Sequence, residues 1–320
     1  MKEVTANYDE SWKEALNEYF ESFLIFFFPE VHQLIDWTQT PRSLDKELQE
    51  ITASSATEKR IADKLYQVWL LDKRVIWILI HIEIQSQYEV DFGERMYVYN
   101  YRSFDLYHKP VVSLAVLGDE SNKWRPNTYS YAIGGCEVSL KFPIAKLLDY
   151  ESRWQELETN TNPFAIIVMA HLKTKATTGN LSEREQWKWT LVRGLYERGL
   201  NKEQIVKLFK IIDMMMTLPE QLQQKLVKKI NSFEEERKMP FISPTEQMAI
   251  ERGKEIGALQ NARNYITTVL QARLGEVSLE IIVSLSLISN LSILDEMLKL
   301  SITVNSLDDF KQALESATLT

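Results

Sequence analysis

The run of residues from Val75 to Gln85 constrains the fold of this chain more than any other segment. Every even position in it is isoleucine, whereas the odd positions begin apolar and end with Glu83 and Gln85. Because side chains alternate between the two faces of a β-strand, this pattern predicts a strand with one face wholly in the core. The other face ends in polar groups, and we interpret it as the start of a functional site.

Composition places the chain among ordinary globular proteins and narrows its partners. Of its 320 residues 45% are hydrophobic and 26% charged, and the net charge of −8 argues against a protein that coats polyanions. Residues 151–245 carry fifteen basic and twelve acidic residues, so a local basic face for nucleic acid is compatible with the acidic total. The single cysteine excludes an internal disulfide, and the four histidines show no metal-ligand spacing.

The N-terminal segment does not have the pattern of a secretory leader. Residues 1–21 are acidic and lack a basic stretch followed by an apolar core. The apolar run Phe23–Pro29 is far too short to span a bilayer. We therefore expect a cytoplasmic protein without a membrane partner.

Periodicity along the chain predicts an α/β protein followed by helices. We expect helices at residues 8–31, at 43–51 with Ser43 as N-cap, and at 94–107. We expect strands at 61–71, 75–85, 111–117, 129–133 and 136–142. The strand–strand–helix–strand order is typical of an α/β layout with a crossover connection. Helical patterns begin near Leu147, and prolines interrupt them at Pro240 and Pro244. The predicted divisions are a core at 1–150, a helical extension at 151–244 and a C-terminal helical domain at 245–320 that could assemble homo-oligomers.

The connection between the first two long strands decides whether Asp63 shares a face with Glu83. A two-residue turn at Asp72-Lys73 would put Asp63 opposite Ile82, on the wrong face. A three-residue loop, Asp72-Lys73-Arg74, would put Asp63 directly opposite Glu83. A shared site therefore requires an odd loop or a bulge.

Clustered carboxylates at such a position are typical of metal-dependent phosphodiester hydrolysis. Asp63 and Glu83 could hold Mg²⁺ or Mn²⁺, which supplies an activated water. Gln85 lies two residues after Glu83 on the same strand face and could orient that water. Unlike lysine, glutamine cannot stabilise developing negative charge, so activity would depend more on the metal, or on a nearby cation such as Arg95.

The chain resembles a bacterial family in several separate segments between Tyr8 and about Lys254. These segments are Tyr8–Leu16, Phe26–Glu30, Ile35–Trp37, Leu44–Leu48, His81–Gln85, Glu94–Arg102, Lys146–Tyr150, Arg193–Gly199 and Glu234–Pro240. The family is the Rpn-like recombination-promoting nuclease/putative transposase group of the PD-(D/E)XK nuclease superfamily. Residues after Gly253 look like the small helical domain of unknown function that is often appended to its members.

The resemblance implies a PD-(D/E)XK (restriction-endonuclease-like) mixed-sheet core followed by an all-α C-terminal region. It implies a metal-dependent DNA endonuclease linked to recombination or mobile elements, with Asp63 and Glu83 as metal ligands and Gln85 as the third catalytic residue. An acid from the first helix could join them; Glu14 fits the order of elements and Glu47 fits proximity to the strands. Arg95 and Tyr99, one helical turn apart, could face the site.

Two other hypotheses remain open on the sequence. The chain could keep a nuclease fold for binding or assembly without catalysis, as its acidic charge, Gln85 and helical tail would suit. It could also act on RNA, for which the same carboxylates would serve.

Overall fold

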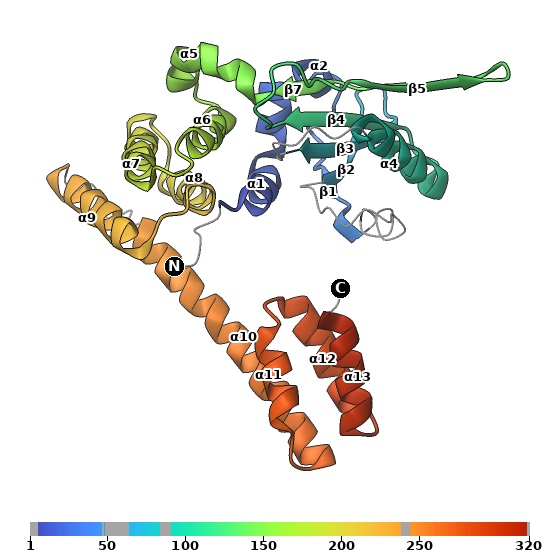
Figure 1. Ribbon diagram of the computed structural model, residues 1–320, viewed down its shortest axis with the longest axis vertical. Helices are drawn as coiled ribbons and strands as arrows, with labels where there is room; N and C mark the ends of the chain where they lie inside the picture. The colour runs from blue at the N-terminus through green and yellow to red at the C-terminus, as the bar shows by residue number, and fades with distance from the viewer. Residues whose placement is uncertain (1–5, 47, 49–63, 84–90, 238–243, 319–320) are drawn as a thin grey trace. The chain divides into compact units, whose positions relative to one another are not determined.

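The computed structural model describes residues 6–46, 48, 64–83, 91–237 and 244–318, and Figure 1 shows its elements. The chain divides into two compact units, Met1–Pro244 and Thr245–Thr320. The first unit contains the sheet and most of the helices, and the second consists of helices alone. Each unit has its own hydrophobic core, so each is described by itself.

A mixed five-stranded sheet forms the centre of the first unit, which makes it an α/β structure. The strands lie in the order β1 (Arg42–Ser43), β2 (Lys64–Trp69), β3 (Val75–Glu83), β4 (Val111–Leu117) and β7 (Ile144–Lys146). Strand β2 is antiparallel to both of its neighbours, whereas β3, β4 and β7 are mutually parallel. The predicted strand–strand–helix–strand order is confirmed, because helix α4 (Phe92–Tyr107) connects the parallel strands β3 and β4.

Helices cover both faces of this sheet. On the face of the even positions, the Tyr66 hydroxyl donates to the Leu16 carbonyl of α1 (Tyr8–Phe27) at 3.1 Å, and the Tyr66 ring stacks on Phe20 at 3.9 Å. On the odd face, Trp77 and Leu65 pack with Tyr99 of α4. The first half of the odd face is therefore core, as its apolar residues predicted.

The first two predicted helices have other bounds than the sequence pattern indicates. The helix predicted over residues 8–31 is two helices, because Phe28 leaves helical geometry and Pro29 begins α2 (Pro29–His32). Ser43 is not an N-cap; it pairs with Tyr66 as a residue of β1, and helical backbone begins at Asp45. The side chain of Leu44 is buried beside Trp77, which draws residues 42–44 onto the sheet.

Strands β5 (Thr128–Ile133) and β6 (Cys136–Lys141) form a separate antiparallel hairpin that projects from the main sheet (Figure 1). Gly134 and Gly135 turn it with positive φ angles, which glycine adopts without steric cost. Its root is anchored where the ring of Tyr129 stacks on Tyr97 of α4 at 5.1 Å.

A helical bundle completes the first unit. It contains the 3₁₀-helix η1 (Leu147–Arg153), α5 (Trp154–Thr159), α6 (Pro163–Ala176), α7 (Leu181–Glu197), α8 (Lys202–Met215) and α9 (Glu220–Glu236). Helix α6 is buried around nearly its whole circumference. Asn162 and Asn201 are the N-caps of α6 and α8, and each side chain accepts a backbone N–H of its own first turn.

The second unit folds around a core of its own. Helices α10 (Pro244–Leu274), α11 (Leu279–Leu287), α12 (Leu291–Thr303) and α13 (Leu307–Thr318) contribute Ile266, Leu285, Leu294 and Phe310 among its buried residues. In the described part of the whole chain, no helix combines the length and the apolarity that crossing a bilayer requires.

Candidate functional site

The three parallel strands end together in one row across the sheet. Glu83 of β3 pairs with Leu117 of β4, and Leu117 pairs with Lys146 of β7, and these are the last residues of their strands. Directly paired residues point to the same face of a sheet. We call this row and the residues that follow it the carboxyl edge. In open α/β sheets, ligands bind outside the carboxyl ends of the strands.

In the ladder between β2 and β3, odd residues of both strands share one face, as predicted, but each residue pairs with a different partner from the one predicted. The loop has the predicted three residues but lies one residue earlier, at Leu71–Lys73, because the Leu70 N–H donates to the Arg74 carbonyl at 2.8 Å. Lys64 therefore faces Ile80, and odd positions pair with odd ones along the whole ladder. The predicted register, which put Lys64 opposite Ile82, is wrong by two residues. The condition that odd residues of β2 pair with odd residues of β3 is nevertheless met.

Two observations explain the loop's position. Lys73 adopts a left-handed φ of 68°, and the Arg74 N–H donates to the Asp72 carboxylate at 3.0 Å. The side chain of Arg74 contacts the same carboxylate at 2.7 Å. Asp72 thereby organises the turn, and Arg74 returns to the ladder.

Only some of the predicted site residues belong to the part of the chain that the structure describes. The backbone of Glu83 is described at the end of β3, and nothing further is described of its side chain. Asp63 and Gln85 lie outside the described residues, as does Glu47. Glu14 lies on α1, which covers the even face, and its carboxylate accepts from Lys210 of α8 at 2.8 Å. The structure therefore places Glu14 on the side of the sheet opposite to the face that Glu83 shares.

Helix α4 brings Arg95 and Tyr99 to the odd face at different distances from the carboxyl edge. The Arg95 guanidinium lies 5.5 Å from the ring centre of Phe92, which packs in the cluster around Leu117. Tyr99 packs instead with Trp77, six residues before Glu83 and thus roughly 20 Å along the strand. Of the two, only Arg95 lies near the end of the strand at which Glu83 stands.

A buried ion pair occupies the β7 end of the row, and the sequence interpretation assigned it no role. The Lys146 ammonium contacts the Asp119 carboxylate, with the two side chains 0% and 3% exposed. The ammonium also lies 5.6 Å from the ring centre of Trp124. Asp119 follows β4 after a single glycine, so an acid just past an apolar strand was the available signal. Because Lys146 engages it, Asp119 serves structure and is not a free metal ligand.

Helix α6 brings two further titratable groups against the carboxyl edge. The Trp12 indole N–H donates to Nδ1 of His171 at 3.3 Å, so the proton of the neutral ring is on Nε2, which donates to the Gly118 carbonyl at 3.3 Å. Burial, with a smaller effect of the nearby Lys175 charge, lowers the pKa of His171 to about 3. His171 is therefore a neutral structural histidine at neutral pH.

One turn further along α6, the Nζ atom of Lys175 is buried and has no hydrogen-bond partner among the described residues. Burial lowers the pKa of Lys175, and the nearby charges of Glu120 and Asp119 oppose that effect. Lys146 acts in the same direction as burial. His171, one turn before Lys175 on α6, contacts the Gly118 carbonyl in the loop after β4.

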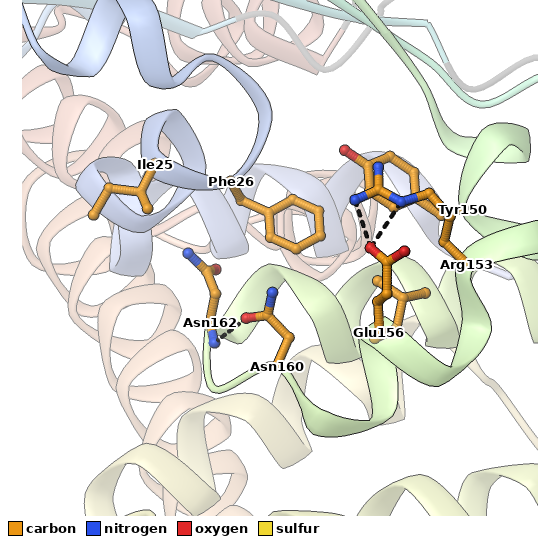
Figure 2. A pocket seen from close by; sticks show the side chains of 8 residues that line it. Ile25, Phe26, Tyr150, Arg153, Glu156, Asn160 and Asn162 are labelled. Atoms are coloured by element: carbon orange, nitrogen blue, oxygen red, sulfur yellow. Dashed lines mark hydrogen bonds and ion pairs between the residues drawn. The ribbon is translucent and has the colours of Figure 1, made fainter.

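Two pockets on the first unit lie away from the carboxyl edge. One of about 190 Å³ lies between the end of α1, η1 and the start of α6 (Figure 2). In it Phe26 stacks on Tyr150 at 5.3 Å, and Glu156 accepts two hydrogen bonds from Arg153. The other, of about 400 Å³, surrounds Lys173 between Trp154 and Trp187. Neither is lined by a residue of the carboxyl-edge row.

No group of three or more histidine, cysteine, aspartate or glutamate residues in the described ranges could hold a metal by itself. A metal at the carboxyl edge would thus depend on Glu83 together with residues outside those ranges, Asp63 first. Comparison with protein-family models, with curated proteins and with solved structures found no match to this chain.

Proposed function

We propose that the chain is a metal-dependent endonuclease of the PD-(D/E)XK type that hydrolyses phosphodiester bonds in DNA. The observation that carries the proposal is the row in which β3, β4 and β7 end, with Glu83 as the last residue of the central strand. The pairing of β2 with β3 supports it. Odd residues pair with odd residues along the ladder, and Asp63 and Glu83 can share a face only in such a register.

The proposed roles follow from the chemistry of the side chains. Carboxylate oxygens are the ligands that Mg²⁺ and Mn²⁺ prefer, so Asp63 and Glu83 would hold the ion. Such an ion, when bound, lowers the pKa of a bound water and stabilises charge on the phosphate. Gln85 would accept and donate hydrogen bonds to orient the attacking water. Arg95, on the same side of the sheet, would offset negative charge near the row.

Removal of either carboxylate tests the proposal. We expect the full chain to nick supercoiled plasmid DNA in Mg²⁺ or Mn²⁺ and not in EDTA. Glu83→Ala and Asp63→Ala should each lower the rate by roughly a thousandfold or more, because each removes charge that positions the ion. Asp105→Ala is a matched control, since Asp105 is an exposed carboxylate on α4. Cleavage that persists in both site variants would contradict the assignment.

The nucleic acid itself is a separate question within this proposal. DNA and RNA of the same sequence should be supplied to the wild-type chain and to Glu83→Ala in parallel. Cleavage confined to RNA, and dependent on Glu83, would keep the site and replace the substrate.

A second candidate function, assembly through the C-terminal unit, is favoured by helix α11. Its outward positions are apolar and exposed at helical spacing: Leu279, Ile282, Val283 and Leu287. Its one charged residue, Glu280, is paired with Lys311 at 2.9 Å. A helix that is apolar on both sides is normally covered on both sides.

Light scattering separates this second function from catalysis. If the exposed apolar residues of α11 join copies of the chain, the full chain should be oligomeric. Leu287→Glu should then lower its mass to that of the monomer. Asp295→Lys, a charge change on neighbouring α12, should leave the mass unchanged. A monomeric wild-type chain would rule out self-assembly by this surface.

A further inference from the structure

The hairpin of β5 and β6 has one apolar face that is only partly covered. Its residues are Tyr129, Tyr131 and Ile133 of β5 with their partners Leu140, Val138 and Cys136 of β6. Near the root, Tyr129 stacks on α4 and Leu140 packs against the cluster around Phe92. Towards the tip, which projects from the main sheet (Figure 1), Tyr131 is 44% exposed and Ile133 77% exposed. Two strands alone are marginally stable, so such a ribbon is normally extended or covered.

The outer edge of β6 is the open edge of this hairpin. On the other side, β5 approaches α4 so closely that a Cβ atom at Gly93 would lie 2.9 Å from the Thr128 carbonyl oxygen. Among the described strands, β6 pairs with β5 alone. The pair that flanks a two-residue turn is hydrogen-bonded, and bonded and non-bonded pairs alternate from there. The backbone N–H and C=O groups of Glu137, Ser139 and Lys141 therefore point outward from β6, where another strand can pair with them.

The sequence of β6 is complementary to itself around Ser139. Glu137 lies two residues before Ser139 and Lys141 two residues after it, and all three side chains are exposed. When a second copy of β6 lies antiparallel on this edge with Ser139 opposite Ser139, Glu137 of each copy meets Lys141 of the other. This register uses every outward N–H and C=O group, and on the apolar face it places Val138 opposite Leu140. A shift of two residues would place Glu137 opposite Ser139 and leave both charges without partners.

We propose that β6 binds β6 of a second copy of this chain, so that two hairpins form one four-stranded antiparallel sheet. Charged residues on an open edge ordinarily keep other strands away. Here their order about Ser139 makes opposite charges meet across a two-fold axis, which only an identical strand provides. The sheet so formed also has a wider, continuous apolar face. Because each copy contributes one short strand, the contact is weaker than an interface of standard size, and covalent trapping is the suitable measurement.

Disulfide trapping tests this contact in the full chain. Every variant carries Cys136→Ser, which removes the single native cysteine. Ser139→Cys places a thiol where the two copies meet, at a Cα separation of about 5.5 Å that a disulfide can bridge. The thiol oxidant diamide should convert this variant to a covalent dimer about tenfold faster than it converts Ser130→Cys. Ser130 is the matched control, because it is exposed, pairs with Ser139 and lies on the other strand of the hairpin.

Charge reversal tests the register. In the Ser139→Cys protein, Glu137→Lys should slow dimer formation about tenfold, because like charges then meet on both sides of the axis. Lys141→Glu should slow it equally, and the double reversal should restore the rate. The two side chains are four residues apart, roughly 13 Å along the strand, so they do not pair within one copy. Damage to the fold of a single copy would not be repaired by the second reversal.

Equal rates for Ser139→Cys and Ser130→Cys would overturn the proposal. A double reversal that leaves the rate as low as in the single variants would overturn it as well, because the charges would then not meet between copies. Trapping requires neither DNA nor a metal ion. The outcome is therefore independent of the plasmid-nicking test, and either proposal can fail while the other stands.

Discussion

Lys188 and Lys175 carry buried ammonium groups in the same unit, and their surroundings are opposite. Lys188 of α7 donates to the Asp213 carboxylate at 2.7 Å, the Met216 carbonyl at 2.9 Å and the Gln223 amide oxygen at 3.1 Å. These acceptors use all three of its donors. Lys175 of α6 has no such acceptor among the described residues.

The difference teaches where the molecule uses charge for structure. In the bundle, the Lys188 site ties α7 to α8 and to the start of α9, and nothing is left for a ligand. Lys146 and Asp119 satisfy each other, whereas the buried Lys175 ammonium has no hydrogen-bond acceptor among the described residues. Stability should therefore depend more on Lys188 and its acceptors than on Lys175.

The largest expected effect is at the bundle site. Asp213→Ala leaves the Lys188 ammonium buried without its carboxylate, which should cost about 3–5 kcal/mol of unfolding free energy. Urea unfolding followed by circular dichroism measures this. Glu203→Ala, in the exposed pair with Lys207, should leave the midpoint unchanged. A small effect of Asp213→Ala would remove the contrast between the two lysines.

The next largest effect depends on pH and measures the free-energy cost of protonating the buried His171. The pKa of His171 falls from 6.5 to about 3 on folding, mainly through burial and secondarily through Lys175. The unfolded chain therefore binds more protons between those values, and stability is full above pH 6.5 and is lost as the pH falls. Each pH unit in this window should remove about 1.4 kcal/mol.

The comparison of wild type with His171→Asn isolates that contribution. Asparagine can still accept a hydrogen bond from the Trp12 indole and does not titrate. The unfolding free energy of the variant should therefore change less between pH 6.5 and pH 4 than that of the wild type. Urea midpoints at several pH values provide the measurement. Parallel pH profiles of the two proteins would show that His171 is not responsible for acid sensitivity.

Much of the sheet was predictable because it depends on local pattern. The isoleucine alternation in Val75–Gln85 and the apolar run Val111–Leu117 predicted β3 and β4, and a helix between them predicted their parallel crossover. The register was missed because it depends on the left-handed backbone of Lys73, which no periodicity reveals.

The charged groups around the row were less predictable, because long-range packing positions them. Lys146 and Asp119 are separated in sequence by the whole β5–β6 hairpin, and only the β4–β7 pairing brings them together. Helix α6 is buried around nearly its whole circumference, so its sequence does not indicate which neighbours Lys175 meets. Glu14 fits the order of elements, and the structure shows its carboxylate engaged with Lys210 of α8, a contact that no pattern around Glu14 indicates.

The smallest expected effect concerns Lys175 itself and decides whether the contrast between the two lysines holds. Lys175→Met breaks no hydrogen bond to a described residue and removes a desolvated charge, so the unfolding free energy should stay unchanged or rise by less than about 1 kcal/mol. Urea unfolding beside Asp213→Ala measures it. A loss comparable to that of Asp213→Ala would make Lys175 a structural cation like Lys188.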